Sequence, residues 1–151
     1  MNNNIQTTAN INPIKAERIA LAKSAYTTRL VDKTTIKTLL NGHWKPKAGD
    51  LVLARVEKIG HHRRIELAHG RRAPLFLGDE IIVSYGHRYA PDQFESEVPG
   101  DLSKCHLVAG GGIASHCLSR HDKARVATSI QPIGLLGDAA GRPINMANWT
   151  V

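Results

Sequence analysis

The middle of the chain shows short runs in which apolar and polar positions alternate. Such runs span residues 51–59, 64–68, 73–77 and 80–85, and Gly, Asp or His residues separate them. Turn signals return about every ten residues, a spacing typical of a small barrel or sandwich. This pattern predicts four short strands.

The words Gly49-Asp50 and Gly78-Asp79 stand before two of these runs. Gly-Asp favours a turn because Gly adopts unusual backbone angles and Asp bonds to nearby backbone groups. The repetition indicates either a pseudo-symmetric barrel made by duplication or the reuse of good turn chemistry.

The N-terminal pattern is helical instead. Asn12-Pro13 favours a helix start, and apolar positions then recur with helical spacing up to about Tyr26. A second helix is predicted over residues 33–40, with Asp32 as its cap and Gly42 as its stop.

These patterns predict three parts. Residues 1–12 are rich in Asn and Thr and are expected to form a disordered tail. Residues 13–45 are expected to form a helical arm, and residues 46–151 a β-barrel-like domain.

The C-terminal part adds a strand at 103–108 and a helix of about two turns at 113–120, with the glycines between them. Residues 125–136 are predicted to form a strand interrupted by Pro132. The expected fold is α+β: a small, mostly antiparallel β-barrel of about six strands, a two-helix N-terminal arm and one short helix after a Gly-rich turn.

The composition indicates which kinds of partner the protein favours. The net charge is +7 and hydrophobic residues make up 42% of the chain, so a globular core comes with a basic surface. A positive surface potential favours anionic partners: nucleic acid, nucleotides, acidic proteins or membrane headgroups. The alternative is that the charge lies only on basic loops that keep the protein soluble. Aromatic residues are scarce at 5%, which disfavours a surface for base stacking.

Two cysteines are too few for a disulfide scaffold, and they fit reduced thiols in the cytoplasm. The sequence contains no apolar run of about 18 residues, so no membrane partner is expected. The polar N-terminal stretch lacks the apolar centre of a secretory signal. Cytoplasmic localisation is the expectation.

The stretch from Ser103 to His121 is the first candidate site. A strand followed by Gly110, Gly111 and Gly112 and then by a helix start would offer free N–H groups to an anion. Ser115 and Arg120 complete this predicted ligand site. The alternative is a tight, flexible connection between strand and helix.

The same stretch holds three candidate metal ligands, Cys105, Cys117 and His121. Cys117 and His121 are four residues apart, on one face of the predicted helix. The spacing C-x11-C-x3-H matches no common zinc module, so no cofactor is expected, with zinc as the alternative. The two thiols would otherwise be small buried hydrophobes.

Basic residues at two predicted hairpin tips form a separate candidate. Arg63 and Arg64 lie at one tip, and Arg71 and Arg72 at the next. Adjacent tips can form one basic edge suited to phosphate backbones. The alternative is a solvated rim that protects edge strands.

Six sequence words carry a resemblance to a known group. They are GDLVLARV, GDEIIVSYG, RYAPDQFE, CHLVAGGG, LSRH and IGLLGDAAGRPIN. With these words the chain resembles the N-terminal region of uncharacterised bacterial proteins in which a P-loop NTPase domain follows. The resemblance implies an accessory domain that regulates or supplies an NTPase. The signature G-x-x-x-x-G-K-[ST] is absent from this sequence, so ATP hydrolysis is not assigned to it.

The expected function is therefore that of a non-enzymatic binding or accessory module, and the resemblance implies a link to an NTPase. Its expected partner is a protein, a second copy of the chain, or an anionic ligand at Gly110. Nucleic-acid binding through the arginine tips is the first alternative. A zinc- or thiol-dependent enzyme at Cys105, Cys117 and His121 is the second.

Overall fold

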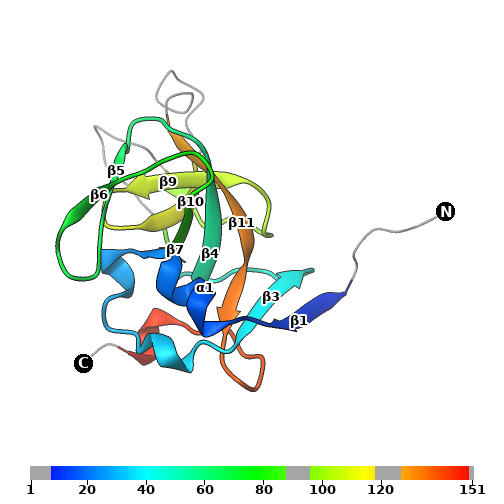
Figure 1. Cartoon of the computed structure of the whole chain (residues 1–151). Coiled ribbons are helices and arrows are strands. Elements are labelled where there is room, and N and C mark those ends of the chain that lie inside the picture. The colour runs from blue at the N-terminus through cyan, green and yellow to red at the C-terminus, as the bar shows by residue number, and fades with distance from the viewer. Residues whose placement is uncertain (1–7, 88–95, 118–126, 150–151) are drawn as a thin grey trace.

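The structure is a computed structural model that describes residues 8–87, 96–117 and 127–149 of the chain. Strands dominate these segments (Figure 1). The strands are β1 Ala9–Pro13, β2 Lys23–Ser24, β3 Thr38–Gly42, β4 Leu51–Lys58, β5 Arg64–Glu66, β6 Arg72–Pro74, β7 Glu80–Tyr85, β8 Ser96–Glu97, β9 Cys105–Ala109, β10 Ile113–Cys117 and β11 Thr128–Gly137. The helices are α1 Ala16–Leu21 and the 3-10 turns η1 Tyr26–Thr28, η2 Lys33–Thr35 and η3 Met146–Asn148.

Five of the strands close into a barrel. β4 lies between β11 and β7 in antiparallel pairing, and β7 pairs in parallel with β10. β10 pairs with β9, and β9 returns to β11, both antiparallel. The expected mostly antiparallel β-barrel is therefore confirmed, and β1 and β3 extend the sheet beyond the barrel.

The barrel interior is filled by every second residue of its strands, because neighbouring side chains of a strand point to opposite faces. Tyr85 is the largest fully buried side chain of this core, and Ile65 reaches it from outside the ring. The other fully buried members on the ring strands are Val52, Ala54, Val56, Ile81, Val83, Cys105, Leu107, Ala114, Ile130 and Leu135.

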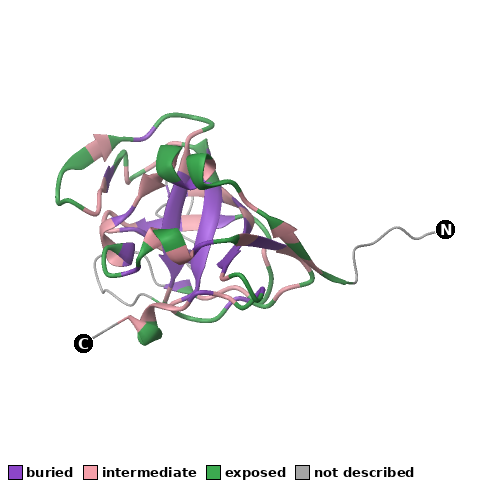
Figure 2. Cartoon of the chain, turned by 60° about the horizontal axis from the view of Figure 1, so that its bottom comes forward, coloured by how far each residue is buried: buried purple, intermediate pink, exposed green. Residues whose placement is uncertain are grey.

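A second core covers the outer face of the same sheet. Leu51 and Leu53 of β4 and Ile82 of β7 are fully buried on that face, where Ile19 of α1 packs in the same cluster. This explains why β4 opens with the unbroken apolar run LVLA, since both of its faces are covered. Figure 2 shows these buried strands at the centre of the molecule.

The predicted two-helix arm is wrong. Its first helix is reduced to the six residues of α1, and its second becomes η2 followed by β3. β3 pairs with both β1 and β11, and these pairings outweigh the modest helix preference of a segment rich in Thr. No helix among the described residues is long and apolar enough to span a membrane.

Two predicted boundaries also differ. Pro13 does not start a helix but ends β1, an edge strand, where a missing N–H costs no ladder bond. Asp32 does act as a cap, but of η2, where its carboxylate accepts the Thr34 N–H. The expected tail is described from residue 8, and most of that part lies in β1.

The short helix predicted after the glycines is wrong as well. Residues 113–117 form β10, and the rest of the predicted helix lies outside the described residues. The glycines are instead the turn of the β9–β10 hairpin, and the Gly112 N–H donates to Ala109 O at 3.0 Å. A hairpin here lets β10 pair with β7 and so close the barrel.

Gly112 gives a stability prediction. Its φ is +103°, and a Cβ at this position would overlap the Cβ of Ala25. Gly112→Ala is expected to lower the free energy of unfolding by about 3 kcal/mol or more, since strain and overpacking add. Urea denaturation followed by circular dichroism measures the change.

Gly70→Ala is the matched control. Gly70 has a φ of +91°, but a Cβ there meets nothing within 4 Å, so only the backbone strain of about 1 kcal/mol applies. Equal losses of unfolding free energy in the two variants would contradict a close contact between Gly112 and Ala25.

Candidate anion-binding site

The hairpin β5–β6 is a two-stranded sheet separate from the barrel ring. Ile65 lies opposite Ala73 and is fully buried in the barrel core. Because side chains alternate along a strand, Arg64 and Glu66 must point to the other face. Arg72 lies directly across from Glu66 and shares that face.

The edge of β5 that does not pair with β6 meets the β9–β10 turn. The Glu66 N–H donates to Gly110 O at 2.8 Å, and the Thr27 N–H donates to Gly111 O at 2.9 Å. Thr27 also donates through Oγ1 to Gly112 O at 2.8 Å. All three glycine carbonyls are thus bonded into the fold.

The N–H groups of the same turn are used differently. Gly112 donates its own within the turn, whereas those of Gly110 and Gly111 have no acceptor among the described residues. Successive free backbone N–H groups form concave anion sites in many proteins. The turn therefore offers two donors next to the hairpin.

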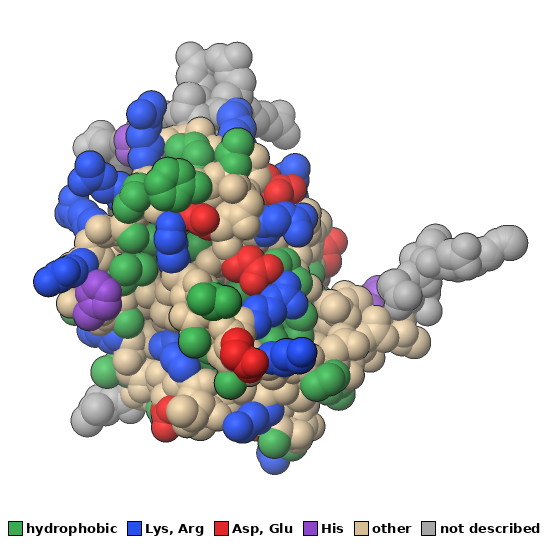
Figure 3. Space-filling view, viewed as in Figure 1, with side chains coloured by type: hydrophobic (Ala, Val, Ile, Leu, Met, Phe, Trp, Pro, Cys, Tyr) green, Lys and Arg blue, Asp and Glu red, His purple; other side chains and the backbone are tan. Residues whose placement is uncertain are grey.

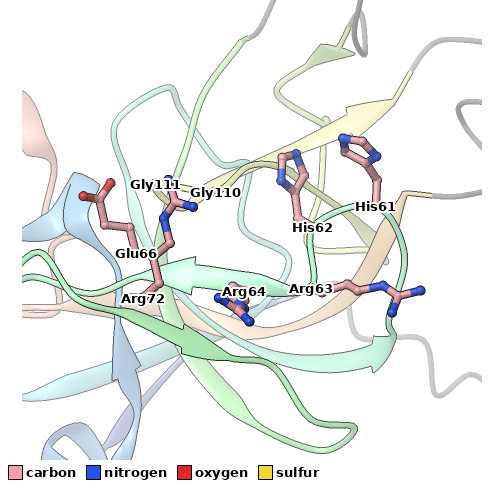
Figure 4. Close-up of a pocket in the computed structure, with 8 residues that line it drawn as sticks. All are labelled: His61, His62, Arg63, Arg64, Glu66, Arg72, Gly110 and Gly111. Atoms are coloured by element: carbon pink, nitrogen blue, oxygen red, sulfur yellow. The ribbon is translucent and has the colours of Figure 1, made fainter.

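A hollow of about 560 Å³ lies between the hairpin and the turn (Figure 4). We call it the hairpin hollow. Its lining contains three guanidinium groups and one carboxylate, so positive charge is in excess. The lining residues are His61, His62, Arg63, Arg64, Glu66, Arg72, Gly110 and Gly111.

The three arginines are exposed, and their guanidinium groups make no ion pair or hydrogen bond with a described residue. Elsewhere the structure pairs such groups: Arg18 holds Glu80 through two bonds of 3.0 and 2.7 Å. Figure 3 shows Lys and Arg side chains gathered along the edge where Figure 1 places β5 and β6.

His61 and His62 form the end of the hollow away from Glu66 (Figure 4). Their rings meet edge to face, with centroids 5.0 Å apart. Thr128 of β11 fixes this segment, because its Oγ1 donates to His62 O at 2.6 Å and accepts the Gly60 N–H at 2.9 Å.

The structure thus joins two sites that the sequence predicts separately. Gly110 and Gly111 come from the predicted ligand loop, and Arg63, Arg64 and Arg72 come from the predicted nucleic-acid tips. These glycines and arginines come together only because the hairpin folds back on the turn, and no local sequence pattern predicts that contact.

The remaining predicted residues lie elsewhere. Gly112 packs behind the turn against Ala25, and Ser115 is fully buried on β10. Arg71 is exposed in the turn before β6 and does not line the hollow. Arg120 lies outside the described residues.

Glu66 was missed by the sequence reasoning. The signal was present, since Arg64 and Glu66 stand on one side of an alternating run whose apolar member is Ile65. In the sequence alone, a carboxylate near Arg64 and Arg72 is most simply interpreted as balancing their charge, so it does not suggest a binding role.

The two cysteines of the predicted metal set belong to different clusters. Cys105 belongs to the core inside the barrel, whereas Cys117 packs with Val108 and Ala127 in a separate cluster. His121 lies outside the described residues. Across residues 8–87, 96–117 and 127–149, no three His, Cys, Asp or Glu side chains group as metal ligands.

A second hollow of about 560 Å³ lies near the end of β3. Its wall includes Trp44, and its charged side chains are Lys45 and Asp101, with His43 beside them. One cation faces one anion there, so this hollow lacks the positive excess of the hairpin hollow.

Comparison with known proteins gives no match: no family model, no curated protein and no solved structure matches the chain. The hairpin hollow is therefore interpreted from its own contacts and charges.

The thiols give a testable consequence. Burial raises the pKa of Cys105 to about 12, so this thiol stays protonated and unreactive near neutral pH. We expect slow alkylation of Cys105 by iodoacetamide in the folded protein at about pH 8, and fast alkylation of both cysteines in urea. Peptide mapping by mass spectrometry distinguishes the two sites. Rapid modification of Cys105 in the folded state would instead favour the thiol-enzyme alternative.

Proposed function

We propose that the protein is a non-enzymatic module that binds a phosphate-bearing anion in the hairpin hollow. The observation that carries the proposal is that three arginines and two backbone N–H groups, none with a partner among the described residues, line one hollow. Arginine binds phosphate through paired hydrogen bonds, and such charge-assisted bonds are among the strongest in proteins.

The arrangement suits a phosphoryl group because its donors come from opposite walls. Arg64 and Arg72 project from the hairpin, and Gly110 and Gly111 lie on the turn facing them (Figure 4). A tetrahedral group with several acceptor oxygens can accept bonds from both walls at once.

The eight described lining residues include no Ser, Thr, Cys or Lys, and their groups with acid or base character are His61, His62 and Glu66. The excluded thiol, Cys105, lies inside the barrel core.

An accessory role beside an NTPase domain belongs to the same proposal. Its support is the resemblance of the chain to a region that precedes such domains, together with a hollow suited to phosphate esters. A second protein as partner is compatible with this role, because the lining of the hollow comes only from residues 61–72 and the β9–β10 turn.

Nucleic-acid binding is the second candidate. The observation in its favour is the exposed rim of Arg63, Arg64 and Arg72 along one edge. Small five-stranded barrels include the OB-folds, which bind oligonucleotides, although a fold alone does not assign a function. No Phe, Tyr or Trp is among the described lining residues, so a stacking platform is missing.

The anion proposal predicts pyrophosphate binding that depends on the hollow. Arg64→Ala and Arg72→Ala should each weaken it by about 10- to 100-fold, as expected for losing a charged hydrogen bond of about 1.5–3 kcal/mol. Isothermal titration calorimetry at fixed ionic strength measures the change.

Arg71→Ala is the matched control, because Arg71 is exposed beside the hollow without lining it. It removes the same charge and should leave the affinity within about twofold. Absence of pyrophosphate binding, or equal losses in all three variants, would overturn the proposal.

A polymer would behave differently. A single-stranded oligonucleotide that spans the rim should contact Arg71 as well, so Arg71→Ala should weaken its binding. The slope of log affinity against log salt concentration should become shallower by about one. Fluorescence anisotropy over a range of salt concentrations measures both. No binding at low salt removes the nucleic-acid candidate and leaves the small-anion proposal in place.

A further inference from the structure

Glu66 is the one acidic residue among the described lining residues of the hollow, where we propose that an anion binds. Glu66 pairs across the hairpin with Arg72 and stands two residues from Arg64 on the same face of β5. Nevertheless, it makes no ion pair with either within the described part of the chain. Elsewhere, carboxylates on β7 and the turn before it are paired, as with Lys23 and Asp79 at 2.6 Å.

The backbone of Glu66 has a structural role, but its side chain has none that the contacts show. The N–H of Glu66 fastens the hairpin to Gly110, and this bond is independent of the side chain. The carboxylate is half-buried, lines the hollow and has no hydrogen-bond donor among the described residues. An ionised carboxylate is an acceptor only, so a ligand that enters the hollow and displaces water from Glu66 has to offer it a donor.

The neighbours of Glu66 restrict what that donor can be. A ligand ammonium group at this position would lie beside the guanidinium groups of Arg64 and Arg72 and be repelled by them. Neutral hydroxyl groups avoid that repulsion. Two hydroxyls on adjacent carbons can donate to the two oxygens of one carboxylate.

We propose that Glu66 selects phosphate esters of hydroxyl-bearing sugars, ribose phosphates above all. The phosphate binds between the hairpin arginines and the amides of Gly110 and Gly111, and the adjacent hydroxyls of the sugar donate to Glu66. This inference rests on the proposed function, since it places the phosphate in the same hollow.

Size and lining agree with such a ligand. A volume of about 560 Å³ falls within the range of small-molecule sites, about 300–1,000 Å³. In Figure 4, Glu66 and Arg72 lie at one end, Arg64 near the middle and the two histidines at the other end. Because Glu66 pairs across the hairpin with Arg72, a pentose whose phosphate contacts Arg72 lies next to Glu66.

The test compares ligands with and without hydroxyls. Calorimetry uses inorganic pyrophosphate, ribose 5-phosphate and 2-deoxyribose 5-phosphate with the wild-type chain and with Glu66→Gln. Removing the negative charge should raise pyrophosphate affinity a few-fold and lower ribose 5-phosphate affinity. The ratio of the two affinities should fall by about 10-fold or more, as for a lost bond to a charged acceptor.

The deoxy sugar checks the contact itself. The wild type should bind 2-deoxyribose 5-phosphate about 10-fold more weakly than ribose 5-phosphate, and Glu66→Gln should bind the two nearly equally. ADP distinguishes the source of the ribose. Weaker ADP binding in Glu66→Gln assigns nucleotides, whereas ADP binding without that dependence leaves free sugar phosphates as the ligand.

Glu57→Gln is the control for net charge. Glu57 pairs with Arg55 at 3.0 Å and does not line the hollow, so this variant should leave both affinities unchanged. Thermal unfolding checks that each variant is folded.

The two proposals fail in distinguishable ways. If the wild type binds neither pyrophosphate nor ribose 5-phosphate, the anion site itself is wrong. If pyrophosphate binds and Glu66→Gln strengthens both ligands equally, Glu66 only balances charge, and the selection of hydroxyls is overturned while anion binding stands.

Discussion

Closure of the barrel depends on one close approach, between Gly112 and the segment before η1. The carbonyl of Gly112 accepts the Ser84 N–H at 3.1 Å and the Thr27 hydroxyl, so a single peptide fastens β7 and the N-terminal segment to the turn. No side chain fits at Gly112, because Ala25 occupies that space. The same turn presents Gly110 and Gly111 to the hairpin hollow. Closing the fold and shaping the site are therefore one geometric requirement.

Charge is used in two ways in this molecule. Around α1 and β2 the ions are paired, and the bond from Arg18 lowers the pKa of Glu80, so this pair stays ionised well below neutral pH. These pairs fasten the N-terminal segments to β7 and the turn before it. Along β5 and β6 the guanidinium groups of Arg64 and Arg72 line a hollow and pair with none of the residues that the structure describes. Pairing in one place and its absence in the other separate structural ions from those available to a ligand.

The strands of the ring were predictable where local pattern and tertiary packing agree. β7 and β9 follow apolar runs between turn residues, and they form close to the predicted positions. β3 was not predictable, because Leu39 and Leu40 fit a helical face equally well, and only pairing with β11 decides between the two. The hollow needed the same kind of distant information. Its glycines and arginines were each recognisable, but their meeting depends on the burial of Ile65.

The β5–β6 hairpin stands outside the ring that closes the barrel, inserted between β4 and β7. Ile65 and Ala73 connect it to the core, and its outward side chains belong to none of the core clusters. Substitutions on that outward face can therefore accumulate at little risk to folding. Exchanging a few of these hairpin side chains would change the charge and shape of the hollow over an unchanged barrel, while the glycine turn on its other wall stays fixed by closure of the ring.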